Sequence, residues 1–150
     1  MSYIHEYMKI ALNQAKNAYN NGEIPIGAVI VKNGEVIAMA SNTCEEHSNP
    51  LMHAEINCIN RAVAILGDKH LTDCDMYVTL EPCPMCMGAI MNARIKRLYI
   101  GATDAQYGAS GSKYNLSETL NHKCEVYFGI LEDECKNLIN NFFEKLRGNE

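Results

Sequence analysis

The chain has 150 residues, a length that predicts one folded domain over residues 1–150. Hydrophobic residues make up 47% of it, which is ordinary for a globular protein, and no apolar run is long enough to span a membrane. The formal net charge of −5 argues against binding nucleic acid through bulk electrostatics, so such a substrate would need a local basic patch. The N-terminus lacks the pattern of a secretory signal, and we therefore expect the chain in the reducing cytoplasm.

The first part of the chain predicts a helix followed by a strand hairpin. Apolar residues recur at helical spacing over residues 4–18. Residues 26–31 form an apolar run typical of a buried strand, and residues 36–40 form its returning partner. Asn33-Gly34 between them is a strong hairpin turn signal. The chain therefore opens with a helix and an antiparallel pair of strands.

The rest of the chain alternates helices with strands, after a polar segment at 44–50 that we expect to be a loop. The periodicity predicts helices at about 53–66, 84–92 and 131–146, strands at 76–80, 97–100 and 125–128, and a glycine-containing loop at 103–115. Alternation of this kind indicates a layered α/β domain. Functional sites of such domains form where strands end and helices begin.

Cys83 and Cys86 are two of seven cysteines, and they are placed to bind a metal. Three residues correspond to about 300° of helical rotation, so both sulfurs lie on one face of the helix that Pro84 begins. The helix dipole in this first turn favours the thiolates that bind metals. We interpret the other five cysteines as small buried or half-buried residues. They are Cys44, Cys58, Cys74, Cys124 and Cys135.

His53 and Glu55 supply an imidazole and a carboxylate about 30 residues earlier. With Cys83 and Cys86, His53 completes three ligands of the kind that binds Zn²⁺ and leaves one tetrahedral position for water. Residues two apart diverge by about 200° on a regular helix. His53 and Glu55 can therefore share a cleft only if His53 lies at the tip of its helix.

The four residues together predict hydrolytic deamination of a nucleobase. Zinc would activate water at neutral pH, while Glu55 moves protons from the water to the ring and then to the leaving amine. For this role Glu55 has to stay free of the metal. A redox pair at Cys83 and Cys86 is one alternative. A structural zinc site is another, and it needs a fourth protein ligand. The candidates for that ligand are His47, His70, Glu81 or another cysteine.

With these motifs the chain resembles the cytidine deaminase-like zinc deaminases, and within them the bacterial tRNA-specific adenosine deaminases. The resemblance covers nearly the whole chain. The zinc motifs are common to the superfamily, whereas Gly111-Ser112, Asn121-His122 and Phe142-Phe143 point to the tRNA branch. The resemblance implies a three-layer α/β/α sandwich around a mixed five-stranded sheet. It also implies a homodimer that converts the wobble adenosine of a tRNA anticodon stem-loop to inosine.

The resemblance further implies the residues that contact the substrate. Asn42 matches the asparagine that hydrogen-bonds the flipped purine, and Ile26 matches an apolar wall of the base pocket. The backbone of Ala54 matches a contact to the base edge, and Asp104 matches a residue near the target sugar. Leu51-Met52 and Ala105-Gln106-Tyr107 depart from the pattern, and Tyr107 is a candidate for stacking on a base.

Three functions are therefore open. The first is deamination of the wobble adenosine in tRNA. The second is deamination of a free nucleobase or nucleoside such as guanine or cytosine, which the acidic composition favours. The third is a zinc-stabilised binding module without catalysis, in which Glu55 would have no purpose.

Overall fold

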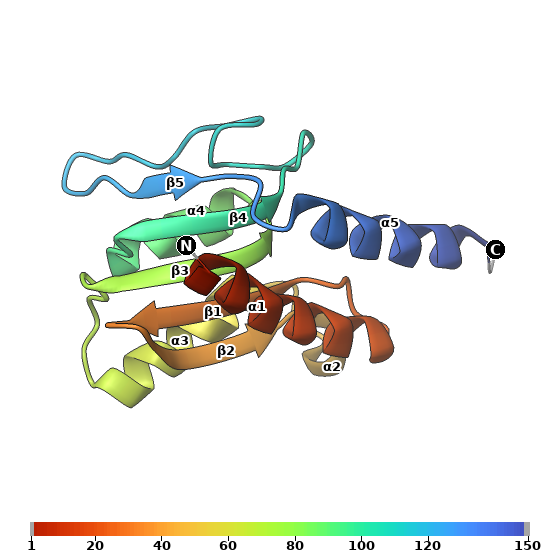
Figure 1. Cartoon of the computed structure of the whole chain (residues 1–150), viewed down its shortest axis with the longest axis horizontal. Coiled ribbons are helices and arrows are strands. Elements are labelled where there is room, and N and C mark those ends of the chain that lie inside the picture. The colour runs from red at the N-terminus through yellow and green to blue at the C-terminus, as the bar shows by residue number, and fades with distance from the viewer. Residues whose placement is uncertain (1, 149–150) are drawn as a thin grey trace.

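The structure is a computed structural model that describes residues 2–148. Within these residues the helices and strands follow one another in the order that Figure 1 labels. They are α1 (Ser2–Asn20), β1 (Gly27–Lys32), β2 (Glu35–Ser41), α2 (Cys44–His47), α3 (Ala54–Leu66), β3 (Cys74–Leu80), α4 (Pro84–Ala93), β4 (Arg97–Ala102), β5 (Glu125–Tyr127) and α5 (Glu132–Gly148).

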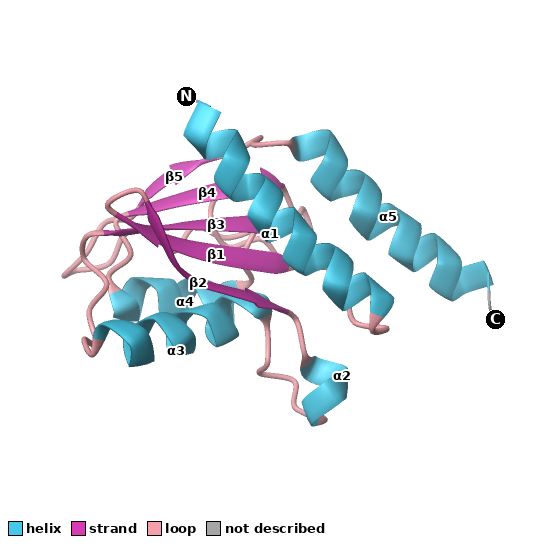
Figure 2. Cartoon of the chain, turned by 60° about the horizontal axis from the view of Figure 1, so that its bottom comes forward, coloured by secondary structure: helices cyan, strands magenta, loops and turns pink. Residues whose placement is uncertain are grey.

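The strands form one mixed sheet in the order β2-β1-β3-β4-β5. β1 pairs antiparallel with β2 and with β3, whereas β3, β4 and β5 run parallel. Helices cover both faces of this sheet, α1 and α5 on one and α3 and α4 on the other (Figure 2). The expected three-layer α/β/α architecture around a five-stranded mixed sheet is confirmed.

The alternation of side chains along each strand explains why both faces need a cover. Ile30 and Met76 belong to the apolar core under α3 and α4, whereas Val29 and Tyr77 belong to the core under α1 and α5. Successive residues of a strand point to opposite faces, so apolar runs such as β1 bury side chains on both sides. The two cores fix the sheet between its helices.

Gly27 sets how closely α1 approaches the sheet. A Cβ atom at this position would overlap backbone atoms of Ala11 and Ala15, both on α1. Its N–H donates to Oγ1 of Thr79 on β3 over 3.1 Å. The first residue of β1 therefore has to be glycine, because helix backbone occupies the space of a side chain.

The start of β1 and the ends of β2, β3 and β4 lie at the same edge of the sheet. Gly27 at the start of β1 pairs with Ser41 at the end of β2, and Leu80 at the end of β3 pairs with Ala102 at the end of β4. The residues just outside these four strand ends therefore lie along the same edge. Open α/β sheets form their sites at such an edge.

The structure differs from the sequence expectation in two places. Residues 44–50 are not all loop, because Cys44–His47 form the short helix α2. The last helix begins at Glu132, since Leu131 has a positive φ of 54°.

The interpretation of the five other cysteines is confirmed, with Cys44 half-buried and the rest buried. Across residues 2–148, none of the helices has the length and apolar character needed to cross a bilayer.

Candidate active site

His53 is the residue at which extended chain turns into α3. It is the N-cap, with φ −70° and ψ 154°, and its carbonyl accepts the N–H of Asn57 over 3.0 Å. Glu55 follows in the first turn, and both side chains line the same cavity. The helix-tip position that the two-residue spacing requires is therefore present.

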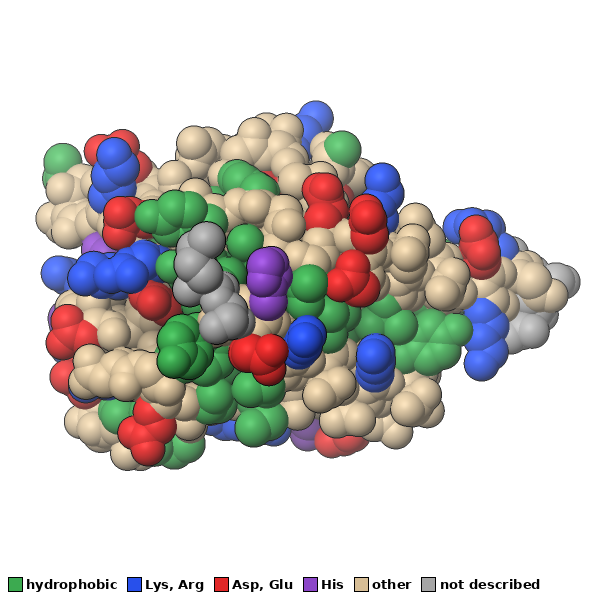
Figure 3. Space-filling model, in the orientation of Figure 1, with side chains coloured by type: hydrophobic (Ala, Val, Ile, Leu, Met, Phe, Trp, Pro, Cys, Tyr) green, Lys and Arg blue, Asp and Glu red, His purple; other side chains and the backbone are tan. Residues whose placement is uncertain are grey.

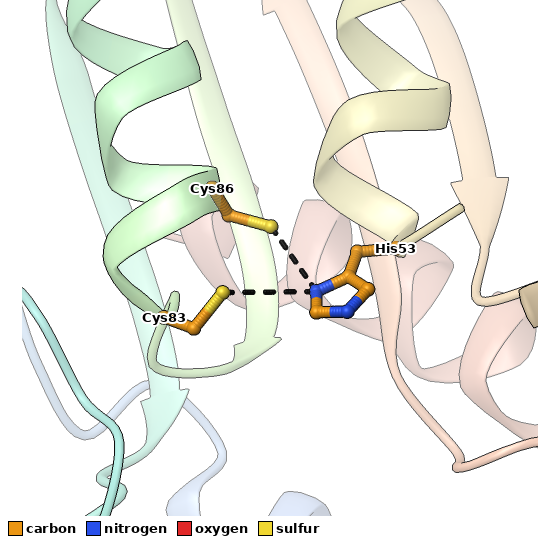
Figure 4. A group of neighbouring side chains, drawn as sticks. All are labelled: His53, Cys83 and Cys86. Atoms are coloured by element: carbon orange, nitrogen blue, oxygen red, sulfur yellow. Dashed lines mark hydrogen bonds between the residues drawn. The ribbon is translucent and has the colours of Figure 1, made fainter. Parts of the chain in front are cut away.

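Cys83 holds the matching position at the start of α4. It is the N-cap, Pro84 begins the helix, and Cys86 lies in the first turn. Figure 4 shows both sulfurs directed at the His53 ring, whose Nδ1 is 3.3 Å from Cys86 Sγ and 3.7 Å from Cys83 Sγ. The three donor atoms lie within 4.8 Å of one another. Two helix starts at one sheet edge thus bring three ligand atoms together.

The donor set fits a metal ion of the zinc type. Two sulfurs and one imidazole nitrogen are ligands that Zn²⁺ accepts in sites with an open position. The pKa of Cys83 is lowered to about 4 because Cys86 and His53 donate hydrogen bonds to its sulfur. The same hydrogen bond to Cys83 raises the pKa of Cys86. A bound cation would replace the protons that these groups otherwise share.

No fourth side chain completes the cluster among residues 2–148. His53, Cys83 and Cys86 form the whole group of neighbouring metal-ligand atoms found there, and His47, His70 and Glu81 do not join it. A structural zinc site normally has four protein ligands, so this arrangement does not support that alternative.

Glu55 is a buried carboxylate beside the cluster. Its side chain is 3% exposed, and Oε1 has no hydrogen-bond partner in the described chain. Burial raises the pKa of Glu55 to about 7. A buried polar atom without a partner calls for an explanation, and an acid that faces a cavity with a pKa near neutrality suits proton transfer to a bound molecule.

The cavity in front of these groups has a volume of about 610 Å³. Its lining combines apolar side chains with residues 103–107 of the loop after β4. The lining residues are Ile24, Ile26, His53, Glu55, Leu80, Glu81, Cys83, Thr103, Asp104, Ala105, Gln106, Tyr107, Ile139 and Phe143. The size and the mixed apolar and polar lining suit a planar base.

The four expected substrate contacts divide into two groups. Ile26 and Asp104 line the cavity with Glu55. Asn42 and Ala54 are buried and do not line it. The N–H of Asn42 donates to the carbonyl of Ile26 over 3.1 Å, so Asn42 adjoins the Ile26 wall.

Sequence reasoning missed two polar residues that support the site, the half-buried Asn57 and the buried Glu23. Nδ2 of Asn57 donates to the Ser41 carbonyl and to Thr43 Oγ1, each over 2.9 Å, and so ties the segment after β2 to α3. The carboxylate of Glu23 accepts the N–H groups of Glu45 and Glu46 over 2.9 and 2.8 Å. These two bonds cap α2 from a distant segment, which local sequence around α2 does not reveal.

The fold and the site together are those of a deaminase of the nucleobase type, with a His-Cys-Cys cluster that is able to hold a metal ion. The profile of the MafB19-like deaminase family matches residues 4–147. The tRNA-specific adenosine deaminase of Bacillus subtilis is 46% identical over 143 residues, which cover 94% of this chain and 89% of that protein. The chain belongs to the family of these deaminases.

Two solved structures extend the comparison. One comes from work on A-to-I editing by tRNA:A34 deaminases at the wobble position of transfer RNA. It is 42% identical, with a TM-score of 0.85, and the match covers 89% of this chain and 98% of that one. The other is a guanine deaminase from Bacillus subtilis, 33% identical with a TM-score of 0.63. That match covers 76% of this chain and 83% of the other.

Proposed function

We propose that this protein hydrolyses the wobble adenosine of a tRNA anticodon loop to inosine. The proposal rests on the match to the tRNA-specific adenosine deaminase of Bacillus subtilis, which is 46% identical and covers 94% of this chain. The cluster of His53, Cys83 and Cys86 beside Glu55 supplies the groups that such a reaction needs. In the balanced reaction water adds to the ring carbon that bears the amine, and ammonia leaves.

We propose zinc as the metal that His53, Cys83 and Cys86 would hold. When bound, zinc would supply a water whose pKa is lowered to about 7. Glu55 accepts the first proton of that water and delivers it to a ring nitrogen of the base, and it then accepts the second proton from the hydroxyl group that has been added to the ring carbon. The same carboxyl then protonates the leaving amine, so Glu55 ends the cycle in its starting state.

The remaining residues of the proposed site position the nucleotide. Ile26 and the apolar wall around it exclude water from the flipped base. Asn42 hydrogen-bonds the purine, the backbone of Ala54 contacts the base edge, and Asp104 lies near the target sugar. Flipping is required because the reacting carbon cannot be reached in a stacked base.

The RNA backbone would be bound by local basic residues rather than by the overall charge. Figure 3 shows that acidic and basic side chains are interspersed on the face with α1 and α5, with no extended region of one sign. The candidates for phosphate contacts are Arg94, Lys96, Arg97, Lys113, His122, Lys123, Lys145 and Arg147. The homodimer and the cytoplasmic location stay predictions, and light scattering would test the first.

A panel of substrates tests the proposed function. The metal-loaded protein is incubated with an anticodon stem-loop carrying a wobble adenosine, and separately with free adenosine, cytosine and guanine. We expect inosine in the stem-loop and no comparable turnover of the free compounds. The similarity to a guanine deaminase makes guanine the informative competitor. Turnover of guanine without editing of the stem-loop would replace the proposal with a free-base deaminase.

A further inference from the structure

Glu81 is a buried carboxylate that the proposed mechanism does not use. It follows the last residue of β3 and lies two residues before Cys83, and its side chain is 3% exposed. Its backbone N–H continues the pairing of the sheet by donating to the Ala102 carbonyl over 2.9 Å. Burying a carboxylate costs free energy unless hydrogen-bond donors surround it. The groups that donate hydrogen bonds to Glu81 therefore indicate its role.

All the hydrogen-bond donors to this carboxylate come from the loop after β4. Oε1 accepts the backbone N–H of Asp104 over 3.1 Å and the hydroxyl of Ser112. Oε2 accepts the backbone N–H groups of Ser110 and Ser112 over 3.0 and 3.1 Å. Hydrogen bonds to an ionised acceptor are about twice as strong as neutral ones. One side chain thus fixes both ends of the segment 104–112.

The ion pairs found within residues 2–148 do not include Glu81. Its carboxylate is instead compensated by three backbone N–H groups and one hydroxyl group of the loop. The burial of Glu81 is therefore linked to the shape of the loop. If the loop opened, the carboxylate would lose four hydrogen bonds at once.

Gly108 shows how closely the loop wraps around the carboxylate. A Cβ atom at this position would overlap the Asp104 carbonyl and the carboxyl group of Glu81. The N–H of Gly108 donates to that same Asp104 carbonyl over 2.8 Å. Its φ is not positive, so glycine is needed here for close approach and not for an unusual backbone angle.

The fixed loop is also one wall of the cavity. Residues 103–107 are among the residues that line it. Asp104, whose N–H is held by Glu81, in turn accepts the N–H groups of Gln106 and Tyr107 on Oδ1 over 3.0 and 3.1 Å. A continuous chain of hydrogen bonds therefore runs from Glu81 to the exposed rim residue Tyr107.

We propose that Glu81 is a positioning residue that holds the 103–112 loop in the shape that receives the RNA around the target nucleotide. Glu81 contributes to binding through this loop and takes no part in the proton transfers. The inference rests on the proposed function, because it concerns how the same site selects a nucleotide within a structured RNA.

Glu81→Gln tests this role with nearly unchanged size. An amide turns an NH₂ group toward two of the loop donors, so at least one hydrogen bond becomes a clash of donors. We expect KM for the anticodon stem-loop to rise about tenfold or more, while kcat falls by no more than about threefold. Zinc content should stay equal to that of the unmodified protein. An unchanged KM, or a fall in kcat alone, would overturn the proposal.

Gly108→Ala disturbs the same contact from the side of the loop. It therefore tests the proposal even if Glu81→Gln fails to fold. It should raise KM in the same way with the metal retained. Gly148→Ala, where the added Cβ meets no atom within 4 Å, is the matched control and should leave both constants unchanged. If Gly108→Ala behaves like Gly148→Ala, the loop shape does not matter and the proposal fails. If the unmodified protein does not edit the stem-loop, the proposed function fails first.

Discussion

His53 and Glu55 lie on either side of the point where extended chain becomes α3, and this lets both side chains reach one cavity. His53 is the N-cap and Glu55 belongs to the first helical turn. On a continuous helix the two would diverge by about 200°. The position of the helix boundary therefore allows two residues only two positions apart to face one cavity, one as a metal ligand and the other as a proton carrier.

Glu55→Gln should abolish catalysis without releasing the metal. General acid–base catalysis contributes about 10² to 10⁴ in rate, so we expect a loss of that size in single-turnover inosine formation. Zinc content should be unchanged, because Glu55 is outside the ligand cluster. Thermal stability should not fall, since Oε1 of the native carboxylate has no partner to lose. A rate within tenfold of the native value would refute the role of proton carrier.

Cys86→Ala should lose the metal and the activity together. Removing one of three ligands leaves a site that cannot hold zinc tightly. Cys58→Ala is the matched control, because this cysteine is equally buried but belongs to the core. Metal analysis after purification without chelator should find zinc in the control and not in Cys86→Ala. A stoichiometric amount of zinc in Cys86→Ala would mean that the cluster is not the metal site.

Gly27→Ala should destabilise the fold strongly, because the new methyl group would overlap the backbone of α1 and not a side chain that can move. We expect a loss of about 3 kcal/mol or more in the free energy of unfolding. Gly88→Ala adds the same methyl group inside α4 where nothing lies within 4 Å. That control should be neutral or stabilising by up to about 1 kcal/mol. Denaturant unfolding of both variants gives the comparison, and similar midpoints would contradict the packing argument.

Alkaline pH should destabilise the protein through its buried thiols. Burial raises the pKa of Cys58, Cys124 and Cys135 to about 12. In the unfolded chain these thiols ionise near their ordinary value of 9.0, so above that pH the unfolded state holds fewer protons than the folded state. The contribution of these thiols to the free energy of unfolding is therefore fully present below pH 9 and is lost as the pH rises toward 12. The loss is up to about 1.4 kcal/mol for each thiol and each pH unit.

Unfolding by denaturant at pH 8, 9, 10 and 11 measures this decline. The Cys58→Ala variant should be less stable at pH 8 because of the lost packing, but its stability should decline less steeply above pH 9. A slope that is identical in the two proteins would show that Cys58 does not ionise on unfolding in this range.

The sequence was sufficient for the architecture and for the chemistry of the site. Alternating strands and helices predicted the layered sheet, and the spacing of His53, Glu55, Cys83 and Cys86 predicted both a ligand cluster and a helix boundary. These features are local, since they depend on periodicity and on residues at helix starts.

The supporting residues could not be predicted in the same way because their partners are distant in sequence. Glu23 caps α2 from 22 residues away, and Glu81 binds a loop that begins 23 residues later. A charged residue near a strand end carries no local signal for either role. The same limit explains why residues 44–47 were expected to be loop, since the cap that stabilises their helix comes from another segment.

Mapping inosine in total tRNA tests the central claim most directly. Unmodified tRNA is incubated with the metal-loaded protein and sequenced, with inosine recorded as a change from A to G. The account predicts inosine at the wobble adenosine and at no other position, and none with Glu55→Gln. Absence of inosine at the wobble position, with ammonia released from free guanine instead, would contradict it.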